Sequence, residues 1–240
     1  MGEACVVAAD AADGVRAEGD TALVATTIGA AQGCLQLEQR LIRFAVGRSR
    51  PRREERDDLL YVVSGVGRLQ RNGEDHELEP GTGVHVAAGE QYEFENPGPD
   101  ELVVVSVLVE PAAEPPPTDR RPVVSLHERP EQRADAKRTF RVLQDTDTGC
   151  AQATQFVGYV EAYRAPDHSH PYDEVGYILA GSGFAHVDGR STPLGPGSCF
   201  HLPPGKVHCI ENAGPETMRI LGVFHPSDSP ASRSYDAATA

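Results

Sequence analysis

The stretch DHSHPYDE, residues 167–174, places two histidines one residue apart and a glutamate four positions after the second. Side chains alternate between the two faces of a β-strand, so His168, His170 and Glu174 share one parity and can face the same side. A third histidine, His208, follows the turn-forming stretch PPG, which directs the chain back into the fold. Three imidazoles and one carboxylate suit a divalent transition metal, so the sequence predicts a site for Fe, Mn, Ni, Cu, Co or Zn.

An internal repeat shows how the surrounding elements are organised. A shift of 116 positions, from residue 78 to residue 194 for example, aligns the two halves of the chain without a gap. The clearest matches are LEPGTGVHVAAG over LGPGSCFHLPPG and ENPGP over ENAGP. Residues 33–108 and 149–224 are therefore two copies of one unit.

Both copies consist of short β-rich runs that end in glycine turns. The 240 residues include 24 glycines and 19 prolines, a mixture that favours many strands and tight turns over long helices. The apolar run at residues 102–108 and its counterpart at 218–224 are continuous, which predicts strands buried on both faces. We therefore expect an all-β fold of two small barrels or double-sheet jelly rolls.

The first copy lacks the histidines of the second. The matching positions are Arg52, Glu54, Asp58 and Tyr92. Arginine cannot ligate a metal because its guanidinium does not lose its proton in a protein. We expect the first barrel to be a scaffold that stabilises the second; the alternative is a second pocket in which Arg52 or Arg53 holds an anion. His201 has a counterpart, His85, in the copy without ligands, so we assign it to the barrel and not to the chemistry.

Composition excludes several classes of protein. A formal net charge of −14 makes nucleic acid a poor partner. No run of 18 apolar residues exists to span a membrane, and we identify no signal peptide. The five cysteines form no CxxC pair, so we expect reduced thiols in a cytoplasmic protein.

The second copy resembles the cupin superfamily. His168, His170, Glu174 and Gly181 have the spacing of the first cupin motif, and the second motif is matched by Gly197, Pro203, Gly205, His208 and Asn212. One departure is Ala162, where the family usually has glycine. The resemblance covers both copies, about two thirds of the chain, so the protein looks like a bicupin: two tandem cupin barrels, or double-stranded β-helices, with a metal site of three histidines and one glutamate in the C-terminal cupin only.

The expected domain organisation follows from the repeat and the resemblance. Residues 1–110 are the N-terminal cupin barrel without metal ligands, 111–138 a proline-rich linker with one short extended segment at PVVSL, and 139–240 the metal-binding barrel with its tail. The tail from about residue 226 is expected to be a surface strap or a frayed end. The expected partner is a small-molecule substrate, and the chain is expected to be a monomer or a homodimer.

The resemblance implies a metal-dependent enzyme acting on a small oxygenated molecule. The leading hypothesis is a dioxygenase similar to quercetinase, for which iron is the favoured metal. The alternatives are a redox-neutral isomerase, cyclase or lyase on the same site, and a non-catalytic cupin that binds a small ligand. Glu174 is the candidate general base, and Tyr172 is a candidate catalytic residue at the lip of the pocket.

Parity also suggests which residues surround the metal. Phe156, Gly158 and Val160 are expected to form one wall of the pocket. Gly158 and Gly176 replace the larger Ile42 and Leu60 of the first copy. We therefore expect these two glycines to make room for a substrate.

Overall fold

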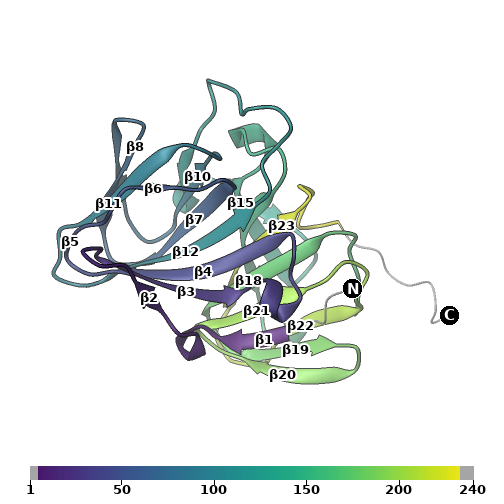
Figure 1. Cartoon of the computed structure of the whole chain (residues 1–240). Helices are drawn as coiled ribbons and strands as arrows, with labels where there is room; N and C mark the ends of the chain where they lie inside the picture. Colours follow the sequence, from purple (N-terminus) through teal and green to yellow (C-terminus); the bar gives the residue numbers. More distant parts are fainter. Residues whose placement is uncertain (1–4, 233–240) are drawn as a thin grey trace.

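The computed structural model describes residues 5–232 and confirms the expected all-β fold of two tandem jelly-roll barrels (Figure 1). The elements up to the end of the first barrel are β1 (Cys5–Ala8), η1 (Ala9–Ala11), β2 (Val15–Arg16), β3 (Ala22–Ile28), η2 (Ala30–Gln32), β4 (Leu37–Phe44), β5 (Gly47–Arg48), β6 (Arg52–Arg53), β7 (Asp57–Ser64), β8 (Gly67–Arg71), β9 (Glu74–Leu78), β10 (Thr82–Val86), β11 (Gln91–Asn96) and β12 (Leu102–Val109). The remaining elements are β13 (Val123–Ser125), η3 (Leu126–Glu128), β14 (Gln132–Arg133), β15 (Arg138–Gln144), η4 (Thr146–Thr148), β16 (Thr154–Val160), β17 (Tyr163–Arg164), β18 (Asp173–Ala180), β19 (Gly183–Val187), β20 (Arg190–Leu194), β21 (Ser198–Leu202), β22 (His208–Asn212) and β23 (Met218–His225). Elements written η are 3-10 helices of three residues each.

Each barrel has one large and one small antiparallel sheet. The large sheets have the strand orders β13-β10-β7-β12-β4-β3-β2 and β1-β21-β18-β23-β16-β15-β14. The small sheets have the orders β5-β11-β8-β9, with β6 also paired to β11, and β17-β22-β19-β20. The two orders match strand for strand at the repeat offset, so the repeat in the sequence is a repeat in space.

Glycine turns join the strands at matching places in both barrels. Gly65 and Gly181 have positive φ angles of 81° and 82°. A Cβ atom would lie 2.4 Å from the backbone oxygen of Glu101 at the first position and 2.7 Å from the Cα of Met218 at the second. Both turns therefore require glycine for its backbone freedom and for the close approach of a neighbouring strand.

The two halves exchange their outermost strands. The strand β1 pairs with β21 of the second half, with Ala8 opposite Ser198, and purple β1 lies among the green strands in Figure 1. The strand β13 pairs in the same way with β10 of the first half, with Ser125 opposite Thr82. Each large sheet is therefore completed by a strand from the other half of the chain.

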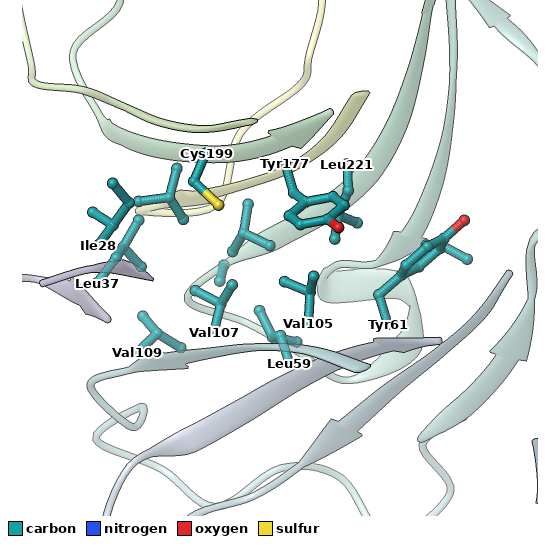
Figure 2. Close-up of a cluster of buried hydrophobic side chains, with 14 of the residues drawn as sticks. Ile28, Leu37, Leu59, Tyr61, Val105, Val107, Val109, Tyr177, Cys199 and Leu221 are labelled. Carbon is teal, nitrogen blue, oxygen red and sulfur yellow. The ribbon is translucent and has the colours of Figure 1, made fainter. Parts of the chain in front are cut away.

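A shared hydrophobic core joins the barrels. Figure 2 shows Leu59, Tyr61 and Val105 of the first half facing Tyr177 and other side chains of the second. This cluster also includes Ile28, Leu37, Val107, Val109, Cys199 and Leu221. Its residues come from both halves, whereas two further clusters fill the interiors of the individual barrels. The first barrel thus packs against the second largely through buried apolar side chains, as a scaffold would.

The expected linker, residues 111–138, contains the strand β13 at the predicted extended segment, followed by η3 and β14. The described part of the tail runs along the second barrel, where Ser227 Oγ lies 2.9 Å from Thr154 Oγ1. All five cysteines are free thiols, as expected. Within the described residues, the structure has no helix long and apolar enough to cross a membrane.

Candidate metal centre

Three of the four predicted ligands meet in the second barrel, and the fourth, His168, lies beside His208. His208 is the first residue of β22, and its backbone exchanges two hydrogen bonds with that of His168, of 2.8 and 3.0 Å. Glu174 is the second residue of β18. The ligand atoms of His170, Glu174 and His208 all lie within 4.8 Å of one another. The ring of His168 is 4.6 Å from that of His208 between centroids.

Backbone carbonyl groups fix the orientation of the three imidazoles. The Nδ1 atoms of His168, His170 and His208 lie 2.9, 2.9 and 2.8 Å from the carbonyl oxygens of Pro166, Tyr172 and Lys206, respectively. A carbonyl oxygen only accepts hydrogen bonds, so each Nδ1 carries the proton and donates it. The lone pair of each ring is then on Nε2, the tautomer of a metal-binding histidine whose second nitrogen is anchored.

The electrostatics of the site favour an ionised Glu174 and a neutral His208. Burial alone raises the pKa of Glu174, but the contact with His170 and the charges of the three histidines outweigh it and leave the pKa lowered. Burial is the main cause that lowers the pKa of His208, and the charge of His170 adds to it. His170 Nε2 lies 3.1 Å from Glu174 Oε2, yet this buried nitrogen has no hydrogen-bond partner in the described part of the chain. A carboxylate, imidazole rings that present Nε2 and one unsatisfied buried nitrogen together fit a divalent cation.

Tyr172, the predicted catalytic residue, packs against a ligand. Its ring stacks on that of His170 at 4.1 Å between centroids and on that of Phe224 at 4.2 Å. Its backbone carbonyl accepts the Nδ1 proton of the same histidine, and its hydroxyl donates to the carbonyl oxygen of Ser232 at 3.4 Å. The residue is therefore built to position His170 and to connect it to the tail.

The ligands line a cavity of about 100 Å³ in the second barrel. Phe156, Gly158 and Val160 lie in its wall, as the parity of β16 predicts. Pro230 and Ser232 also line it, so the described tail covers part of the mouth. An apolar cavity with a few polar groups at one end is the usual form of a small-molecule site.

The expectation that Gly176 makes room for a substrate is wrong. A Cβ at Gly176 would lie 2.1 Å from Cζ of Phe200, the residue opposite it on β21, so the aromatic ring already occupies the space. At the same cross-strand position the first barrel has Leu60 opposite Val84. The ring of Phe200 therefore takes the place that a side chain at position 176 would occupy. A Cβ at Gly158 would meet no atom closer than 3.5 Å, and this glycine does face the cavity.

Arg138, which the sequence did not single out, also lines the cavity. It is the first residue of β15 and lies opposite Val160. In the first barrel Ala22 lies opposite Phe44, at the matching register. Extending the repeat alignment upstream of residue 33 would have shown that an arginine in the second copy replaces an alanine in the first.

The corresponding place in the first barrel is closed by its own side chains. Tyr92 and Ser106 each donate a hydrogen bond of 2.7 Å to the buried carboxyl of Asp58. Arg52 forms an ion pair of 2.9 Å with Asp20, and this contact holds the arginine side chain within the barrel. Within residues 5–232, no group of three or more potential metal-binding side chains gathers at this place.

A second cluster of potential ligands lies between the barrels. Cys34, Asp173 and His201 have atoms within 4.8 Å of one another and are buried. Burial raises the pKa of Cys34 to about 11, so its thiol stays protonated and is a poor ligand. His201 is bonded to Asp173 at 2.7 Å, and the pair recurs as His85 and Asp57 at 3.0 Å in the first barrel. Its presence in both halves fits a role in the fold.

Comparison with solved structures finds the same architecture at low sequence identity. YlbA from E. coli has 13% identity and a TM-score of 0.76, with 95% of this chain and 93% of that chain covered. AerE from Microcystis aeruginosa has 13% identity and a TM-score of 0.75, with coverages of 90% and 97%. A variant of oxalate decarboxylase from Bacillus subtilis has 13% identity and a TM-score of 0.74, with coverages of 92% and 76%. At this identity the likeness concerns the fold alone.

No curated protein matches the chain at the level of sequence. The family model of the cupin domain matches it twice, at residues 40–108 and 159–224, which together are more than half of its length. The two matches coincide with the two barrels and with the two copies of the repeat. The chain is therefore a member of the cupin family with two cupin domains.

Proposed function

We propose that this bicupin is a metal-dependent enzyme for a small oxygenated organic molecule. The C-terminal barrel alone binds one divalent transition metal, through His168, His170, Glu174 and His208. The observation that carries the proposal is the common anchoring of the three imidazoles, whose Nδ1 atoms all bond to backbone carbonyl groups. Histidines that serve only the fold have no reason to share one tautomer with converging Nε2 atoms.

The chain's own residues have separate roles in this proposal. A bound metal would polarise an oxygen of the substrate and make a neighbouring proton more acidic. Glu174, whose lowered pKa keeps it ionised at neutral pH, accepts such a proton as general base. Tyr172 holds the ring of His170 by stacking, and Phe156 and Val160 exclude water from the inner wall.

The size of the cavity bears on the choice of substrate. Its volume of about 100 Å³ is well below the roughly 300–1,000 Å³ of pockets for drug-sized ligands. This favours a compact substrate over the polycyclic substrate of a quercetinase-like dioxygenase. A compact substrate suits both reaction classes that the sequence suggested, an oxygenase and a redox-neutral isomerisation, cyclisation or elimination, and their dependence on oxygen distinguishes them.

Metal binding is tested first. Protein purified without a tag is expected to contain one transition metal per chain by elemental analysis. Removing a residue that only hydrogen-bonds to a metal ligand typically lowers metal affinity roughly 10- to 100-fold. His170→Ala removes a proposed ligand itself, so calorimetric titration should show a loss of metal affinity of at least this size. The matched control is His186→Gln, which removes a histidine bonded to Ser191 and Glu211 on the same barrel. Equal metal content in both variants, or none in the wild type, would contradict the proposal.

The class of reaction is tested with oxygen. Iron or copper in the purified protein would favour a reaction with oxygen, and zinc would disfavour it. A redox-neutral enzyme turns over at the same rate under strict anaerobiosis, whereas an oxygenase consumes oxygen in proportion to substrate and stops without it. Tight binding of a ligand with no product under any metal would instead establish a non-catalytic cupin.

A further inference from the structure

Arg138 presents an unused hydrogen-bond donor to the cavity. Its side chain is only 13% exposed, and its Nε donates to Asp135 Oδ2 at 2.7 Å. Its Nη2 atom is buried and has no hydrogen-bond partner within residues 5–232. A charged donor kept from water without an acceptor is costly, so its retention calls for an acceptor that arrives with a ligand.

The guanidinium is held in place from behind. Asp135 accepts hydrogen bonds from Arg138 Nε, from the hydroxyl of Tyr163 at 2.8 Å and from the backbone N–H of Lys137 at 2.9 Å. These contacts use one edge of the guanidinium fork and leave Nη2 for another group. A planar, pre-positioned guanidinium is well suited to a carboxylate because its donors match the two oxygens.

The charge pattern of the cavity points to the same ligand chemistry. Arg138 is the one lysine or arginine among the described residues that line it, and much of the remaining wall is aromatic or aliphatic. An electrostatic interaction at this place is strong because apolar walls screen it poorly. In the first barrel, which lacks the metal ligands, the matching residue is Ala22. The arginine and the ligands therefore occur together in one barrel and are absent together from the other.

We propose that Arg138 binds a carboxylate of the substrate, which makes the substrate a small organic acid. Its carboxylate lies at Nη2, and its oxygen-bearing carbons extend towards His170, Glu174 and His208. A cavity of about 100 Å³ limits such an acid to a few carbon atoms. This assignment deepens the proposed function and rests on it for the reaction, but the binding of the acid can be measured separately.

The test compares an acid with its uncharged amide. The probes are 2-hydroxypropionate and 2-hydroxypropionamide, which have nearly the same shape, titrated calorimetrically into metal-loaded wild type, Arg138→Met and Arg138→Lys. We expect the wild type to prefer the acid, and Arg138→Met to bind it about 10- to 100-fold more weakly with little change for the amide. Arg138→Lys should restore part of the preference because it keeps the charge but loses the fork.

The matched control is Arg141→Met, which removes an arginine of the same strand that bonds to the carbonyl oxygen of Arg129 and does not line the cavity. It should bind both probes as the wild type does. Equal binding of the acid by the wild type and Arg138→Met, or no preference for the acid in the wild type, would overturn the assignment.

A metal-free arm separates this proposal from the proposed function. The same titrations are repeated after chelation, with metal content measured for every variant. If no metal binds but the preference for the acid still depends on Arg138, the proposal of a metal-dependent enzyme is wrong and the carboxylate site is supported. If every variant binds metal normally and Arg138→Met changes nothing, the carboxylate site alone fails.

Discussion

Replacing Gly176 by alanine tests how the second barrel is packed. The new Cβ would lie 2.1, 2.5 and 2.5 Å from three ring atoms of Phe200, which is 1% exposed. Overpacking of this kind costs about 1–3 kcal/mol. Replacing glycine also lowers the conformational entropy of the unfolded chain, which stabilises the protein by about 0.4–1 kcal/mol. We expect a net destabilisation of about 1–2 kcal/mol, or a fall in Tm of about 2–8 °C for a chain of this length.

The assay is denaturant unfolding of the metal-free variants, read from the midpoint at unchanged slope. Gly158→Ala is the matched control, because its Cβ would meet the nearest atom at 3.5 Å, an ordinary contact. It should be as stable as the wild type or slightly more stable. The double variant Gly176→Ala with Phe200→Val should lose less free energy of unfolding than the sum of the two single variants. The first barrel likewise has a larger residue, Leu60, opposite valine at this position. If Gly176→Ala unfolds at the same midpoint as the wild type, the reasoning about this pair is refuted.

Two further predictions concern buried titratable groups. Tyr92→Phe removes a donor to the carboxylate of Asp58 and should cost about 1.5–3 kcal/mol at pH 7. Burial raises the pKa of Asp58, so this carboxyl takes up its proton at a higher pH in the folded state than in the unfolded chain, and the loss measured by denaturation should become smaller as the pH is lowered. The pKa of His208 is lowered mainly by burial, so the unfolded chain takes up this proton first. The stability of the metal-free wild type should therefore fall as the pH drops below about 6.5, and His208→Gln should weaken that dependence in the same measurement.

The repeat made the fold and the ligand positions predictable. The gapless offset identified the barrel that lacks the histidines. Strand parity did not place His168, His170 and Glu174, because the two histidines lie between β17 and β18 and only the glutamate lies in a strand. Whether these residues hold a metal is a matter for the titrations proposed above.

The errors and omissions have a common physical cause. Parity tells which face of a sheet a side chain occupies, but not which neighbouring side chain fills the space above it. Gly176 was therefore assigned to the substrate although Phe200 from the adjacent strand covers it. Arg138 was missed because it lies on a strand upstream of the aligned motifs and reaches the cavity only through the curvature of the barrel.

The exchanged strands affect the order in which the molecule can be assembled during synthesis. The strand β1 leaves the ribosome long before its partner β21, which ends at residue 202, so β1 must wait until the second barrel has been made. The first large sheet likewise gains its last strand only when β13 has emerged. Pairings between such distant segments are slow to form and make the two halves fold as one cooperative unit. The first barrel then cannot be removed without unfolding the second, which gives a physical reason for the first barrel to persist.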